Sequence, residues 1–146
     1  EDECIEYIEK CRTEFKSLPP EEVSFPRTAS NVEKWHSSSD LYGKGCPIHI
    51  RGAILYNHWT KKKDIDHKYA TIQNGEKIKF CYLKTPNWMH ENVISFIQDF
   101  PTELDLDKHV DYDLQFSKAF LDPVKVILDC IGWETERKNT LESFFS

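Results

Sequence analysis

The sequence lacks the motifs that identify several classes of protein. Its five cysteines are odd in number and irregularly spaced, with no Cys-x-x-Cys pair, which argues against a disulfide framework or a cysteine-rich zinc site and favours a reducing cytoplasm. No apolar run approaches the roughly 20 residues that a membrane-spanning helix needs. No glycine-rich phosphate loop, nucleophile elbow or Cys/His catalytic arrangement occurs.

Charge is present but unevenly distributed. The net charge of −6 argues mildly against binding to nucleic acid. Between Lys44 and Lys84, however, there are nine basic residues and only three acidic ones. A basic middle segment between acidic ends is typical of a surface that binds a polyanion such as nucleic acid. An ordinary solvated surface would give the same composition.

Hydrophobic periodicity predicts mostly helix. The chain begins within an amphipathic helical pattern, so we expect further sequence upstream of Glu1. Pro19-Pro20 ends that helix, and Pro123 is expected to kink or break the last one, which Gly132 would stop. Helices are predicted over residues 1–18, 31–35, 47–59 and from Asp111 onward, and residues 21–27 are predicted to be extended. Asn31 would cap the second of these helices. In the third, Ile50, Ala53, Ile54 and Trp59 would face inward.

A smaller β signal follows the Asn74-Gly75 turn dipeptide. Residues 76–84 alternate, with Ile78, Phe80 and Tyr82 on one face and the lysines on the other, and residues 93–97 predict a second strand. The fold class is therefore α+β: a mostly helical domain with a small antiparallel β element and an extended C-terminal tail.

The basic middle supplies the candidate phosphate contacts. A helix that begins at Pro47 directs its free amides toward whatever precedes it, and glycine permits close approach of the backbone. Alternatively, the glycine only permits tight helix packing and the lysines only solubilise a strand. The candidate DNA-binding residues are Lys44, His49, Arg51, Gly52, Lys77, Lys79, Lys84 and Asn87.

The last residues form a second candidate site. Leu141, Phe144 and Phe145 recur at helical spacing and would form one apolar face of a single turn. Such a cluster after a charged stretch suits docking into a partner such as a sliding clamp. The alternative is that the turn folds back onto its own domain.

Potential metal ligands do not form a recognisable motif. Three Asp-x-Asp pairs begin at Asp64, Asp105 and Asp111, and none lies in the hairpin between hydrophobic strands that a two-metal site favours. Cys46 and His49 have no second pair of ligands at zinc-site spacing. We therefore predict no catalytic residue and no metal site in this chain.

Three segments together resemble the C-terminal part of T-even-type bacteriophage DNA polymerases, which belong to family B. Residues 43–57, Gly-Lys-Gly-Cys-Pro-Ile-His-Ile-Arg-Gly-Ala-Ile-Leu-Tyr-Asn, resemble the start of the thumb helix. Residues 74–84 with Asn87 are similar to the thumb strand, although Trp88 replaces a proline there. Residues 140–145, Thr-Leu-Glu-Ser-Phe-Phe, resemble the clamp-binding peptide.

The resemblance implies a division of labour within a polymerase. Residues 1–35 would end the palm domain, 36–133 would form the thumb, and 134–146 would be the sliding-clamp-binding tail. The partners implied are primer–template duplex, the clamp and the rest of the polymerase, in the cytoplasm of an infected bacterial host. The catalytic residues and their two magnesium ions belong to the rest of the enzyme, so this fragment alone should not polymerise.

Two other hypotheses remain open from the residues. One is a stand-alone protein-interaction module whose basic face meets an acidic partner. The other is a small metal-dependent nuclease that uses one of the Asp-x-Asp pairs. A reading frame continuing upstream into palm motifs would exclude the first, and magnesium-dependent cleavage of DNA by the pure chain would support the second.

Overall fold

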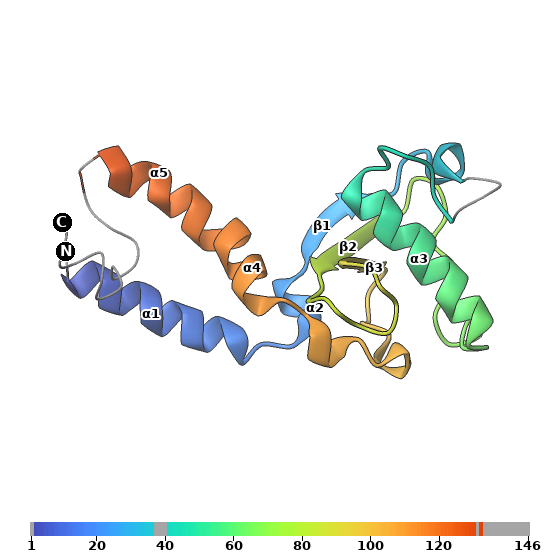
Figure 1. Cartoon of the computed structure of the whole chain (residues 1–146), viewed down its shortest axis with the longest axis horizontal. Coiled ribbons are helices and arrows are strands. Elements are labelled where there is room, and N and C mark those ends of the chain that lie inside the picture. The colour runs from blue at the N-terminus through green and yellow to red at the C-terminus, as the bar shows by residue number, and fades with distance from the viewer. Residues whose placement is uncertain (1, 37–40, 131, 133–146) are drawn as a thin grey trace. The chain divides into compact units, whose positions relative to one another are not determined.

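The computed structural model describes residues 2–36, 41–130 and 132. It confirms the predicted α+β class, because the chain combines helices with a three-stranded antiparallel sheet (Figure 1). The chain divides into two compact units, a central one formed by Pro19–Asp111 and a flanking one formed by Glu1–Leu18 with Tyr112–Ser146. None of the described helices has the length and apolar content needed to span a membrane.

The central unit is built on a sheet with the strand order β1–β2–β3. Both β1 (Phe25–Thr28) and β3 (Val93–Phe96) pair antiparallel with β2 (Lys77–Tyr82). Residues that pair across antiparallel strands share a face of the sheet. One face therefore carries Phe25, Arg27, Ile78, Phe80, Tyr82, Val93 and Ser95, and the other carries Pro26, Thr28, Lys77, Lys79, Cys81, Ile94 and Phe96.

The alternation predicted for β2 is correct in part. Ile78 and Phe80 are buried and Lys77 is exposed, as expected, while Tyr82 is half-buried. Cys81 departs from the pattern, because the lysine face is also covered: α2 (Pro20–Val23) lies against β2. Burial raises the pKa of the Cys81 thiol to about 12, so this cysteine is a packed core residue rather than a reactive one.

Helix α3 (Ile48–Lys62) lies beside β3 on the face that carries Phe80 (Figure 1). Its predicted inward residues Ile50, Ala53 and Ile54 are buried, and Trp59 is half-buried. The helix begins one residue later than predicted, because Pro47 occupies the N-cap with extended ψ of 146°.

Two local predictions before α3 need correction. Residues 21–23 are helical rather than extended: they belong to α2, whose first residue is Pro20, a position that suits a proline. Asn31 does precede the 3₁₀ helix η1 (Val32–Trp35), but it has a φ of 56° and its side chain makes no cap. The cap comes from the distant turn instead, since the Val32 N–H donates to Asn74 Oδ1 at 2.7 Å. Two further 3₁₀ helices, η2 (Thr102–Leu104) and η3 (Asp107–His109), follow the sheet.

The flanking unit is helical. Helix α1 (Asp2–Lys16) contacts α4 (Tyr112–Phe116), and a π-helical segment, η4 (Ser117–Leu121), leads into α5 (Asp122–Cys130). The interruption predicted from Pro123 is present as this π-helical segment, because proline has no N–H and its ring clashes with the carbonyl four residues earlier. The core of the unit consists of Ile8, Phe116, Leu121 and Leu128.

Candidate nucleic-acid interface

Arg51 connects the first turn of α3 to the segment before β3. Its Nη2 donates to Asn92 Oδ1 at 2.6 Å, and its guanidinium lies 5.7 Å from the centre of the Tyr42 ring. The Tyr42 hydroxyl in turn donates to Glu91 Oε1 at 2.6 Å. Burial, with that hydrogen bond to Glu91 also contributing, raises the pKa of Tyr42. Arg51 therefore links two loops around the start of the helix.

Asn87 organises the loop that follows β2. Its Nδ2 donates to the carbonyl oxygens of Lys84 and Glu91, at 2.9 and 2.8 Å. Its Oδ1 accepts the Met89 N–H at 3.0 Å. Asn87 is only 6% exposed, and both of its amide hydrogens are already used within the loop. The structure thus gives the predicted DNA contact Asn87 a local role, in shaping the loop that begins at Lys84.

Three of the predicted basic residues lie at the same end of the central unit. Leu83 N–H donates to the Asn92 carbonyl at 2.8 Å, which places the exit of β2 beside the residue that Arg51 holds. Lys44 borders a hollow of about 400 Å³ together with Leu41, Tyr42 and Glu91. We call Lys44, Arg51 and Lys84 the helix-entry surface. Lys44 and Lys84 are exposed, and neither side chain has a hydrogen-bond or ion-pair partner in the described parts of the chain.

His49 and Gly52 are predicted contacts that the structure turns toward the sheet. The His49 ring lies 6.3 Å from the centre of the Phe80 ring. Burial, reinforced by the nearby Arg27 charge, lowers the pKa of His49, so the imidazole is neutral at pH 7 and adds no charge. A Cβ on Gly52 would come within 2.5 Å of Ser95 Oγ, so this glycine is accounted for by tight helix packing.

Lys77 and Lys79 lie on the other face of the sheet from α3. Lys79 is half-buried there, and its Nζ donates to the Glu21 carbonyl at 3.2 Å. Lys77 is exposed at the start of β2, about 23 Å of extended chain away from Lys84. The sequence groups these lysines with the start of α3, whereas the structure separates them from it.

One cationic feature was not predicted. At the end of α3, the Lys63 Nζ lies 5.1 Å from the Trp88 ring centre, and the Lys62 Nζ lies 5.3 Å from that of Trp59. The two tryptophan rings meet edge to face at 4.8 Å. Nothing in the local sequence around either tryptophan signals this contact, because it joins a helix to a distant loop.

The remaining predicted residues are an aspartate pair, a cysteine and the C-terminal apolar residues. Asp113 forms ion pairs with Lys16 at 2.9 Å and Arg12 at 3.8 Å, which gives the second aspartate of one Asp-x-Asp pair a structural role in the flanking unit. Within the described ranges, Cys46 belongs to no group of three metal-ligating side chains. The predicted clamp-binding residues Leu141, Phe144 and Phe145 lie outside the described residues.

These features define an α+β module in which three basic side chains, those of Lys44, Arg51 and Lys84, lie near the start of α3. The chain is similar to a DNA-directed DNA polymerase of Enterobacteria phage T4, with 24% identity over 149 residues. The similarity covers 99% of this chain and 16% of that polymerase, so the chain corresponds to about a sixth of its length. No family model matches the chain. The comparison supports a relationship to a phage DNA polymerase.

Proposed function

We propose that this chain is the C-terminal part of a T-even-type family B DNA polymerase, where it grips the primer–template duplex and tethers the enzyme to its sliding clamp. The observation that carries the proposal is the similarity to the T4 polymerase along 99% of the chain. In that role the chain contributes binding rather than chemistry. The catalytic residues and two magnesium ions would be supplied by the rest of the polymerase, in the cytoplasm of an infected bacterial host.

The proposed parts follow the resemblance. Residues 1–35 end the palm, 36–133 form the thumb, and 134–146 form the clamp-binding tail. The helix-entry surface of the thumb contacts DNA phosphates through Lys44, Arg51 and Lys84. Lys44 and Lys84 have no side-chain partner among the described residues, and Asn92 holds Arg51 in place. Lys77, on the other face, makes a separate contact, and Lys79 contributes less because the Glu21 carbonyl holds it.

Backbone contacts of this kind make affinity strongly dependent on salt. Each phosphate that a lysine neutralises contributes about −0.9 to the slope of log affinity against log salt concentration. We expect primer–template duplex to bind with a steep slope, and the double variant Lys44→Ala/Lys84→Ala to flatten it by about 2. Lys125→Ala, an exposed lysine of α5, is the matched control and should leave the slope unchanged.

The same titration separates the alternatives. Binding that does not depend on salt, or an equal effect of the control variant, contradicts the proposed surface. Failure to bind DNA, combined with capture of an acidic protein, would favour a protein-interaction module instead. Magnesium-dependent cleavage of the duplex would favour the nuclease hypothesis.

The tail is tested independently of DNA. We expect the double variant Phe144→Ala/Phe145→Ala to abolish binding to the sliding clamp encoded with this chain, because apolar side chains at the end of such a peptide fill the partner's pocket. Leu141→Ala should weaken it, and Asn139→Ala is the control. Unchanged clamp affinity in the phenylalanine variant, measured by calorimetry, would refute the clamp-binding role.

A further inference from the structure

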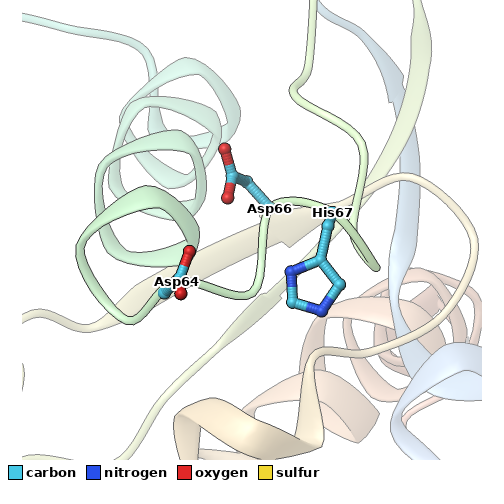
Figure 2. Close-up of side chains that lie close together, drawn as sticks. All are labelled: Asp64, Asp66 and His67. Atoms are coloured by element: carbon cyan, nitrogen blue, oxygen red, sulfur yellow. The ribbon is translucent and has the colours of Figure 1, made fainter.

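The turn that ends α3 brings three metal-ligating side chains together. Asp64, Asp66 and His67 each have one ligand atom within 4.8 Å of the other two. Figure 2 shows the three side chains on this turn. All three are exposed, and none has a hydrogen-bond or ion-pair partner for its side chain among the described residues. We propose that they bind a single divalent first-row transition-metal ion.

The turn is fixed to the body of the central unit, which makes the arrangement more than a chance meeting of mobile side chains. The Tyr56 hydroxyl donates to the Ala70 carbonyl at 2.8 Å. Asn57 binds both backbone groups of Ile72, donating to the carbonyl at 3.0 Å and accepting the N–H at 2.8 Å. Within the turn, the Ile65 N–H donates to the Thr60 carbonyl at 2.9 Å. A site built on such a supported turn loses little conformational entropy on binding.

The distances suit an ion after a small rearrangement. Metal–oxygen and metal–nitrogen bonds of about 2.0–2.2 Å hold neighbouring ligand atoms about 3–3.5 Å apart. Exposed side chains need to move by only about an ångström to reach that separation from 4.8 Å. Water completes the coordination, because the site is open to solvent on its outer side.

The helix dipole favours a cation at this position, although four lysines flank the two carboxylates in the sequence. Asp64 and Asp66 follow the C-terminal end of α3, where the helix dipole is negative. Three of the four neighbouring lysines make other contacts: the Nζ of Lys63 lies 5.1 Å from the Trp88 ring centre, that of Lys62 lies 5.3 Å from the Trp59 ring centre, and that of Lys68 lies 3.2 Å from Glu103 Oε1. The fourth, Lys61, is exposed, and neither carboxylate forms an ion pair with any described residue.

The ligand set indicates the class of metal. Magnesium and calcium prefer oxygen ligands alone, whereas an imidazole nitrogen with two carboxylates suits manganese, cobalt, nickel or zinc. Manganese is the better probe here, since the five free cysteines of the chain would also attract softer ions such as zinc. Manganese is also paramagnetic and marks its position in an NMR spectrum.

A second segment of the chain with the same types of potential ligand serves as a control. Asp105, Asp107 and His109 repeat the same residue types within five positions, but they do not form a ligand group in the described structure. If carboxylates and a histidine near one another in sequence were enough, both segments would bind manganese. If the spatial arrangement of the ligands matters, only the turn after α3 should bind manganese.

The experiment is a manganese titration of the isotope-labelled 146-residue chain, followed by amide NMR spectra. We expect substoichiometric manganese to broaden the signals of residues 63–69 first, and the variants Asp66→Asn and His67→Ala to weaken binding at least about tenfold, because even loss of a supporting second-shell group costs about 10–100-fold. The controls Asp107→Asn and His109→Ala should bind like the parent chain.

Three outcomes would overturn the proposal. One is broadening centred on residues 105–109, or spread evenly over exposed carboxylates. Another is unchanged manganese affinity in both site variants, whose spectra also show whether the fold is retained. The third is displacement of manganese by equimolar magnesium, which would mean that His67 contributes nothing. None of these outcomes bears on DNA or clamp binding, so the experiment tests the metal site independently of the proposed function.

Discussion

Gly52 of α3 and Ser95 of β3 are in direct contact. A Cβ on Gly52 would lie 2.5 Å from Ser95 Oγ and 2.8 Å from its backbone nitrogen. The same hydroxyl donates to the His49 carbonyl at 2.8 Å. Together the two contacts hold the first turn of α3 against the sheet, and they thereby set the position of Arg51 and of the helix-entry surface.

Replacing Gly52 with alanine should therefore destabilise the chain. Overpacking a close contact costs about 1–3 kcal/mol, and here the neighbour is partly backbone, which moves less readily than a side chain. The control is Gly43→Ala, whose Cβ would lie an ordinary 3.5 Å from the Trp35 carbonyl oxygen and should change stability by less than about 0.5 kcal/mol. Urea unfolding measures both, and equal stability of the two variants would contradict this account of Gly52.

The elements of the fold are largely predictable because their signals are local. Apolar spacing identifies α1, α3, α5 and the two later strands, and Pro123 correctly predicts an interruption. The alternation does not reveal that Cys81 is buried, because it assumes one solvated face, and α2 covers that face here. The helix at Pro20–Val23 is missed because four residues are too short to show a period.

The candidate site is less predictable because its contacts join distant residues. Arg51 meets Asn92 across 41 residues and Tyr42 meets Glu91 across 49. The basic middle of the sequence correctly identifies a cationic stretch, but charge counting carries no information on which lysines share a surface. Lys77 begins β2 and Lys84 lies two residues beyond its end, and only the pairing of β2 with its neighbours separates Lys77 from α3.

Asn87 provides a test of a structural role against a DNA-binding one. Asn87→Ala removes two donated hydrogen bonds and leaves the Met89 N–H without its acceptor, so we expect a loss of about 1–3 kcal/mol in the free energy of unfolding. The exposed Gln98→Ala is the matched control and should be neutral. Retained stability with reduced DNA affinity would instead assign Asn87 to the DNA.

His49 predicts a dependence of stability on pH. Because folding lowers its pKa below that of the unfolded chain, mainly through burial, the unfolded state binds more protons near pH 6. The free energy of unfolding should therefore rise with pH as the solution passes from about 5 to 7. His49→Gln should flatten this rise. Burial also lowers the pKa of His58, so the remaining slope should decrease further in the double variant with His58→Gln.

A slope unchanged by both histidine substitutions would show that other groups cause the dependence. The measurement is urea unfolding at several pH values under constant ionic strength. Because a neutral His49 carries no charge to a phosphate, we also expect His49→Gln to leave the salt slope of DNA binding unchanged at pH 7.

Arg51 combines a structural contact with a proposed phosphate contact, and two variants separate them. Asn92→Ala removes the 2.6 Å hydrogen bond but keeps the charge, so it should lower stability by about 1 kcal/mol without changing the salt slope of DNA binding. Arg51→Ala removes both and should lower stability while also flattening the slope by about 0.9. If Asn92→Ala flattens the slope as much as Arg51→Ala does, Arg51 acts on DNA only by holding the loop before β3, and the phosphate contact belongs to Lys44 and Lys84 alone.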